Sequence, residues 1–270
     1  MDINLEDIIE EAMESATPTE VKHEEPVQRF ELNPPLINVT TSRFSSAEWY
    51  NKMRELSVTI AGLGGIGSYV AFLVGRLNPS VMLIFDDDTV ESVNMSGQLY
   101  QRNQVGTTKT HATWNNIFAF SNFTNIRTVN ERLTEFSNIF PILICGFDNM
   151  DARRAAFYNW NAMRKQLFDK KDYLFIDGRL AAEEFQVFCM TGEDEYLINK
   201  YEKEWLFSDK EAEATECSYK QTSFCANMIG SVIVNLLVNY VTNLCDPVIP
   251  RELPFKTTYN ASLMQFTTEL

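Results

Sequence analysis

Short apolar runs alternate with helix-like patterns over most of the chain. Several runs are apolar at nearly every position, which is typical of strands that are buried on both faces of a sheet. These runs are SVTIAG at 57–62, VMLIFD at 81–86 and PILICGFD at 141–148, with a further strand expected at 124–132. Helical patterns lie at 68–77, 108–120 and 151–168. The alternation predicts an α/β domain built on a doubly wound, mostly parallel, Rossmann-like sheet.

The last third of the chain adds strands and one long helix. Strands are expected at 173–178 and 185–190, and the tail from 251 to 270 could close with one or two more. We expect these strands to form an antiparallel C-terminal extension. Residues 222–244 form a long apolar helical pattern, which is interrupted by Asn227, Asn235, Asn239 and Asn243. These polar breaks favour a buried helix over a membrane span, so no membrane contact is expected.

Residues 1–40 differ in composition from the rest. The first 31 positions hold ten acidic residues and two basic ones, and prolines follow. We expect a flexible acidic tail or linker here, and a single globular domain over residues 41–270. The stretch LEDIIEEAMES has the pattern of an amphipathic helix. A solubilising arm and a docking helix for a partner both remain open for this segment.

Overall charge and cysteine content exclude several classes of protein. The formal net charge of the 270 residues is −14, which argues against binding to duplex nucleic acid because such binding needs clustered Lys and Arg. The N-terminus lacks the basic and apolar pattern of a signal peptide. Five cysteines without a C-x-x-C pair argue against a zinc ribbon. We expect free thiols and a cytoplasmic protein.

Four glycines stand between the first strand and the first helix, and they indicate a phosphate-binding turn. Gly62, Gly64, Gly65 and Gly67 would let the backbone approach a phosphate, and a helix starting near residue 68 would offer free N–H groups to an anion. Asp86 closes the next strand, where an acid can accept hydrogen bonds from ribose hydroxyls. A tight turn without a ligand is the alternative.

Carboxylates after the second strand distinguish between possible nucleotides. The stretch FDDDTVESVN brings three adjacent acids, and Lys109 follows in VGTTK. A dinucleotide dehydrogenase has no obvious use for so many acids beside its pyrophosphate. A site for Mg²⁺-ATP does, because carboxylates hold the metal and a lysine neutralises phosphate charge.

These segments, in this order, resemble a known family. GLGGIGS, DDDTVESVN, VGTTK and CGFDNMDAR are similar to motifs of the ThiF/MoeB/HesA adenylyltransferases, which are related to the ubiquitin-activating enzymes. The resemblance covers residues 43–180 and continues more weakly to about 244. It implies that residues 41–270 are an adenylation domain. Such a domain uses Mg²⁺-ATP to convert a carboxylate, usually the C-terminal glycine of a ubiquitin-like protein, into an acyl-adenylate with release of pyrophosphate.

The resemblance also implies roles for individual residues. The four glycines would lie under the nucleotide, and Asp86 would hold the ribose. Asp88 would lie near the phosphates, and Asn94 and Gln98 would line their pocket. Lys109 would contact the departing phosphates. Asp148 would be the Mg²⁺ ligand, with Asn149 beside it. Lys109 could instead be a solvated lysine at a helix start, and Asp148 could be only a helix N-cap. Arg153 could have a structural or a catalytic role.

Two features depart from the family pattern. The family usually reads Asn-x-x-Arg-Gln, with its arginine on the triphosphate, whereas this sequence has Gly97 at that position. Arg43 and Arg102 are the candidates to supply the missing charge. The paired C-x-x-C motifs that hold a structural zinc in several relatives are absent, so no zinc is expected.

Cys217 precedes the long C-terminal helix. In some relatives a cysteine in this region accepts the activated acyl group as a thioester, and Lys220 lies nearby in the sequence. An ordinary thiol is the competing interpretation. Asp177 and Arg179 could likewise bind an incoming peptide tail or form a structural salt bridge.

Three alternatives to this function stay open. The chain could be a non-catalytic ThiF-like subunit of a heterodimer, as Gly97 would favour. It could also be an NAD-dependent oxidoreductase, or it could adenylate a non-protein carboxylate or a modified tRNA base. By the family resemblance we expect a homodimer whose partner is a small ubiquitin-like or sulfur-carrier protein ending in glycine. The sequence names neither the substrate nor the pathway.

Overall fold

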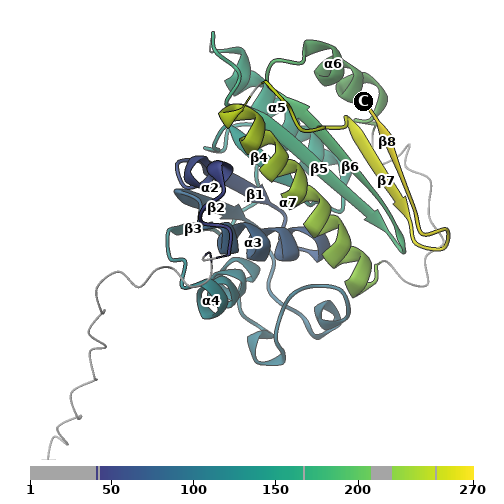
Figure 1. Ribbon diagram of the computed structural model, residues 1–270. Coiled ribbons are helices and arrows are strands. Elements are labelled where there is room, and N and C mark those ends of the chain that lie inside the picture. Colours follow the sequence, from purple (N-terminus) through teal and green to yellow (C-terminus); the bar gives the residue numbers. More distant parts are fainter. Residues whose placement is uncertain (1–40, 42, 167, 208–220, 247) are drawn as a thin grey trace, which may run out of the picture. The chain divides into compact units, whose positions relative to one another are not determined.

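The computed structural model describes residues 41, 43–166, 168–207, 221–246 and 248–270 (Figure 1). Its strands are β1 (Ser57–Ala61), β2 (Val81–Phe85), β3 (Ile126–Val129), β4 (Ile142–Cys145), β5 (Leu174–Ala181), β6 (Glu184–Thr191), β7 (Lys256–Asn260) and β8 (Gln265–Glu269). Its helices are α2 (Glu48–Met53), α3 (Gly65–Leu77), α4 (Lys109–Ser121), α5 (Met150–Lys165), α6 (Glu195–Glu204) and α7 (Ser223–Cys245), with short 3₁₀ turns η1 (Ser92–Ser96) and η2 (Arg102–Gln104).

One sheet runs through the described part of the chain in the order β3-β2-β1-β4-β5-β6-β7-β8. The first five strands of the sequence pair in parallel, and β6, β7 and β8 continue the sheet in antiparallel pairs. This arrangement confirms the predicted α/β fold with its antiparallel extension. The predicted tail and Cys217 lie outside the described residues.

Helices cover both faces of the central strands, which explains why β2 and β4 are apolar at every position and β1 is buried along almost its whole length. On one face, α3 packs over β1 and β5, and α7 packs on α3, β5 and β6 through residues that include Ile229 and Ile233. On the other face, Phe157 of α5 and Tyr201 of α6 pack on β4 and β5. A strand with helices on both sides has no solvent-facing positions to fill with polar residues.

Among the described helices, only α7 is long and apolar enough to cross a membrane, with 23 residues and a hydropathy of 1.6. In the structure it lies against α3 and the strands β5 and β6 (Figure 1). Ile229, Ile233 and Leu237 on its inner face are fully buried in the core cluster. The predicted buried helix is therefore confirmed as part of the core.

The parallel part of the sheet places its ligand-binding crevice beside β1. From β1 the chain proceeds to β2 and β3 on one side, and it returns to β4 and β5 on the other. In open α/β sheets of this kind, ligands bind at the carboxyl ends of the strands where the order reverses. The residues that follow β1, β2 and β4 therefore meet at one edge.

A buried ion network joins α5, β5 and α6. The carboxylate of Asp177 is fully buried and accepts hydrogen bonds from Arg153 at 2.9 Å, from Arg179 at 2.8 Å and from the Tyr201 hydroxyl at 2.8 Å. Arg153 also donates to the carbonyl oxygens of Phe147 and Gly178. This arrangement supports the structural interpretation of Asp177, Arg179 and Arg153, because a fully buried carboxylate cannot reach a substrate.

Candidate functional site

The turn after β1 is held by contacts that only glycine permits. Gly62 has a φ of +81°, a conformation that other residues rarely adopt. A Cβ on Gly67 would lie 1.7 Å from the carbonyl oxygen of Gly62, and one on Gly146 would lie 2.9 Å from the Gly67 nitrogen. The turns after β1 and β4 are therefore packed backbone against backbone.

Helix α3 begins at Gly65, three residues before the start expected from the sequence. Gly64 is its N-cap, and the first helical hydrogen bond runs from the Ser68 N–H to the Gly64 carbonyl at 3.1 Å. Gly65 and Gly67 are thus part of the first turn, where close packing explains the choice of glycine. The free N–H groups of this helix end belong to residues 64–67, and they carry the positive end of the helix dipole.

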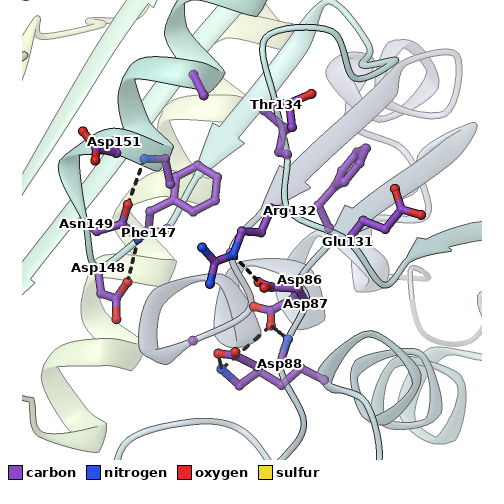
Figure 2. A pocket seen from close by; sticks show the side chains of 18 of the residues that line it. Asp86, Asp87, Asp88, Glu131, Arg132, Thr134, Phe147, Asp148, Asn149 and Asp151 are labelled. Atoms are coloured by element: carbon purple, nitrogen blue, oxygen red, sulfur yellow. Dashed lines mark hydrogen bonds and ion pairs between the residues drawn. The ribbon is translucent and has the colours of Figure 1, made fainter.

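A cavity of about 730 Å³ opens in front of this turn (Figure 2). This volume is within the usual range for small-molecule sites. Its lining includes Gly64, and a Cβ added there would meet no other atom within 4 Å. The cavity is also lined by the end of β2 with its following loop, by the loop after β3 and by the turn from β4 into α5, which contribute residues 85–88, 131–136, 146–149, 151 and 152. The glycine turn and the predicted acids therefore share one cavity.

Gly64→Ala and Gly67→Ala should have different effects. The Gly67 methyl group would collide with backbone, so we expect a loss of about 1–3 kcal/mol in the free energy of unfolding. The Gly64 methyl group would enter the cavity instead, so stability should change by less than about 1 kcal/mol while nucleotide affinity falls. Urea unfolding and ATP titration of both variants measure this contrast. Wild-type stability of Gly67→Ala would contradict the close packing described above.

Asp86 fixes the glycine turn and borders the cavity. Its carboxylate accepts hydrogen bonds from the Leu63 N–H at 2.6 Å and from the Asp88 N–H at 2.9 Å. Burial raises the pKa of this carboxyl group, although the charge of Lys109 and both hydrogen bonds oppose the rise. Tyr100, which the sequence analysis did not single out, donates from its hydroxyl to the Leu63 carbonyl at 2.6 Å. Hydrogen bonds thus hold both the backbone N–H and the backbone carbonyl of Leu63.

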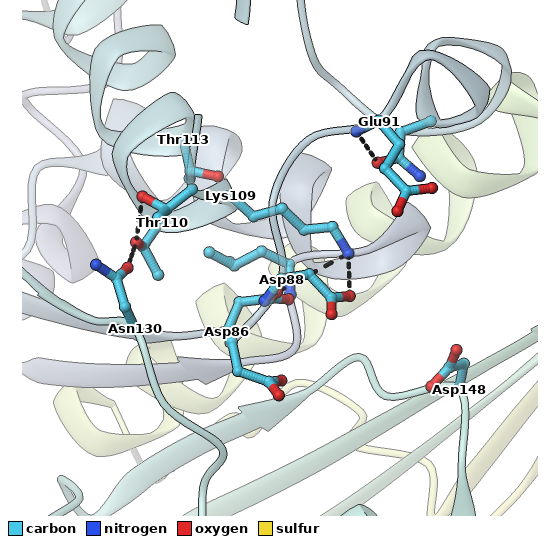
Figure 3. Close-up of polar contacts among 12 residues, drawn as sticks. Asp86, Asp88, Glu91, Lys109, Thr110, Thr113, Asn130 and Asp148 are labelled. Carbon is cyan, nitrogen blue, oxygen red and sulfur yellow. Dashed lines mark hydrogen bonds and ion pairs between the residues drawn. The ribbon is translucent and has the colours of Figure 1, made fainter. Parts of the chain in front are cut away.

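Lys109 is the first residue of α4, and its ammonium group is directed toward the cavity (Figure 3). Its Nζ lies 2.7 Å from Asp88 Oδ2 and 3.8 Å from Asp86 Oδ1. The lysine side chain is only 8% exposed, whereas Asp88 is 62% exposed. A buried, paired ammonium group contradicts the interpretation of Lys109 as a solvated surface lysine.

Asp148 lies after β4, across the same cavity from Lys109 (Figure 3). The N-cap of α5 is Asn149, whose side chain accepts from the Ala152 N–H at 2.8 Å. The interpretation of Asp148 as only an N-cap is therefore wrong. Its exposed carboxylate accepts a hydrogen bond from Asn149 at 3.1 Å and stays free for a ligand.

Arg132 is a cavity residue that the sequence analysis missed. It lies on the loop after β3, and its Nε donates to Asp87 Oδ2 at 2.7 Å. Figure 2 shows its guanidinium group between the acids that follow β2 and the turn that bears Asp148. Sheet order could have indicated it, because a residue after β3 comes next to one after β2.

Other predicted residues do not reach the cavity lining among the described residues. The side chain of Asn94 caps η1 by accepting from the Glu91 N–H at 2.8 Å, and the side-chain oxygen of Gln98 is buried without a partner in the described part. Arg43 and Arg102 also lie away from the described lining. The roles given to these residues stay predictions.

The described cysteines are free thiols, as expected. Cys145 and Cys225 are fully buried, and burial raises the pKa of Cys189 to about 12. Such thiols are not nucleophilic at neutral pH. Cys217 lies outside the described residues, so its role in covalent chemistry stays a prediction.

Comparison with known proteins identifies the family. A sequence profile described as the ThiF family matches residues 38–269. The chain belongs to the ThiF family. Over 80 residues it is 39% identical to ubiquitin-like modifier-activating enzyme 5 of Arabidopsis thaliana, which covers 30% of this chain and 19% of that protein. The match thus spans about a fifth of that relative's length.

Solved structures share the fold of this chain. The crystal structure of selenomethionine PaaA has a TM-score of 0.62 at 15% identity, covering 82% of this chain and 66% of that one. The crystal structure of Escherichia coli MccB with ATP has a TM-score of 0.61 at 10% identity, covering 82% and 65%. At these identities the similarity shows the fold alone. The chemistry of this ThiF-family member therefore has to be argued from its own cavity.

Proposed function

We propose that this protein is a Mg²⁺-ATP-dependent adenylyltransferase that activates a carboxylate. One observation carries the proposal: Lys109 and Asp148, from distant parts of the chain, line one cavity together with Gly64 at the N-terminus of α3. A cation, a free carboxylate and a helix end are the groups that a metal-bound triphosphate needs. MccB, a protein of the same fold, was crystallised with ATP.

The charges around the cavity fit a nucleotide that arrives with a divalent cation. Among the described residues, seven acids line it against two basic residues, Lys109 and Arg132. The acids are Asp86, Asp87, Asp88, Glu131, Glu135, Asp148 and Asp151. A bare triphosphate would be repelled by this surface, whereas carboxylate oxygens are the ligands that Mg²⁺ prefers. Asp148 is the residue we propose to hold it, and the bound ion would neutralise phosphate charge.

The chain's own groups then position the reaction. A carboxylate oxygen of the substrate attacks the α-phosphorus, the bond from that phosphorus to the bridging oxygen of the β-phosphate breaks, and pyrophosphate leaves. Free N–H groups of residues 64–67 bind phosphate oxygens, and Lys109 exchanges Asp88 for the departing phosphates. Asp86 accepts hydrogen bonds from the ribose. No covalent bond to the protein is needed in this step.

The substrate we propose is the C-terminal glycine of a small ubiquitin-like or sulfur-carrier protein. Its support is the similarity to ubiquitin-like modifier-activating enzymes, together with the family itself. Transfer of the acyl group to Cys217 and pairing of two chains into a homodimer belong to the same proposal. The NAD-dependent alternative has less support, because the cavity offers more acids than a dinucleotide would use.

Thermal unfolding with different nucleotides tests the nucleotide class. A ligand at a hundred times its Kd stabilises a protein by about 2.7 kcal/mol, so Mg²⁺-ATP should raise the Tm by about 5 °C or more. ATP with EDTA and NAD should each give a smaller shift. Stabilisation by NAD but not by Mg²⁺-ATP would overturn the proposed function. ATP–pyrophosphate exchange with a glycine-tailed protein then tests the substrate.

A further inference from the structure

The loop after β3 brings one exposed arginine into the nucleotide cavity. Arg132 has a side chain that is 83% exposed, although it lines the cavity. It reaches the site only because β3 lies beside β2, which places Arg132 opposite the acids that follow β2. Figure 2 shows the guanidinium group in the space that these acids share with Phe147 and Asp148.

Within the described residues, a single hydrogen bond holds this side chain. Its Nε donates to Asp87 Oδ2 at 2.7 Å, and Asp87 is itself 40% exposed. The terminal nitrogens Nη1 and Nη2 have no partner in the described part of the chain, so four N–H groups are left for a ligand. Asp87 raises the pKa of Arg132 most, and the charges of Asp88 and Asp148 add to the rise. The guanidinium group therefore faces both acidic sides of the cavity.

Lys109, the other basic residue of the described lining, is more buried and more tightly paired than Arg132. Lys109 is almost completely buried and is paired with two acids. An exposed ion pair such as Arg132–Asp87 is worth about 0–1 kcal/mol, so it breaks at little cost when a stronger partner arrives. Phosphate is such a partner, because the planar guanidinium group matches its oxygens with two parallel hydrogen bonds.

We propose that Arg132 exchanges Asp87 for the phosphates of the bound nucleotide and is the second basic side chain of the phosphate site. This inference rests on the proposed function. In it, Arg132 binds phosphate oxygens through Nη1 and Nη2, while Lys109 binds phosphate oxygens from the start of α4. Asp87 holds the arginine in place while the site is empty and competes with the nucleotide for it.

Titration of ATP, AMP and adenosine, each with Mg²⁺, into Arg132→Ala tests the assignment. Loss of a charge-assisted contact should weaken ATP binding by about tenfold, weaken AMP binding less and leave adenosine within about twofold. Arg132→Lys should recover part of the ATP affinity. Arg127→Ala removes the same charge from the exposed side of β3, outside the described lining, and should bind ATP like wild type.

Asp87→Ala should change the affinity for ATP in the opposite direction. Removal of the competing acid should strengthen ATP binding by about twofold to fivefold when Arg132 is present, and by less in the Asp87→Ala, Arg132→Ala double variant. Equal loss of ATP and adenosine affinity in Arg132→Ala, or no loss, would overturn the assignment of Arg132 alone. A wild-type protein that binds none of the three ligands would overturn the proposed function instead.

Discussion

Asp148→Asn should weaken Mg²⁺-dependent ATP binding by about tenfold to a hundredfold, because mutation of a direct metal ligand removes at least as much affinity as loss of its hydrogen-bonding partners. The substitution keeps the shape of the side chain but removes its charge. Asp148 is exposed and does not cap α5, so folding should be unaffected. Calorimetric titration of ATP, with Mg²⁺ and with EDTA, separates the metal-dependent part of the affinity.

Asp172→Asn is the matched control for this variant. Asp172 is an exposed acid outside the described cavity lining, so its replacement should leave ATP binding unchanged. If Asp148→Asn retained the full difference between Mg²⁺ and EDTA, the metal role of Asp148 would have to be abandoned. Binding of ATP that is equally weak with and without Mg²⁺ is the expected behaviour.

Asp177→Ala should destabilise the protein by about 3–5 kcal/mol, which is the usual cost of removing one partner from a buried charge network. The substitution leaves Arg153 and Arg179 without their shared carboxylate and Tyr201 without its acceptor. Burial raises the pKa of the Tyr201 hydroxyl, so this group stays neutral in the variant and loses its acceptor. Urea unfolding followed by circular dichroism measures the loss.

Asp169→Ala shows what an exposed acid contributes by comparison. Its ion pair with Lys171 is more than half exposed on both sides, so stability should change by less than about 1 kcal/mol. A loss for Asp177→Ala no larger than that of Asp169→Ala would contradict the structural role of the network. It would also reopen the interpretation of Asp177 and Arg179 as substrate-binding residues.

Periodicity predicted the parallel core but not the smaller elements. The strands β2 and β4 are apolar throughout, and β1 departs from this only at Ser57 and Thr59, because helices cover both faces; this pattern is visible in the sequence. The helix α6, with the sequence EYLINKYEKE, buries only Ile198 and Tyr201, so its apolar stripe was too narrow to notice. The start of α3 was misplaced because its first turn is made of glycines that ordinarily indicate a loop.

The candidate site could be predicted only where a polar residue directly follows an apolar strand. Asp86 and Asp148 each follow an apolar strand, so their meeting at one edge follows from a parallel sheet. Asn149 and Asp148 are both good helix caps, and backbone geometry alone decides between them. Arg132 follows β3, a strand with two exposed positions and no apolar run, so only the order of the strands in the sheet could have indicated it.

The glycine turns after β1 and β4 pack closely against each other, so the part of the cavity lining that they form is rigid. Backbone atoms of Gly62, Gly67 and Gly146 pack so closely that neither turn can shift relative to the other. Another part of the lining, formed by residues 131–136, meets the cavity with exposed side chains such as Arg132 and Phe136. Accommodation of nucleotides of different size should therefore come from that part of the lining, while the glycine side keeps its shape.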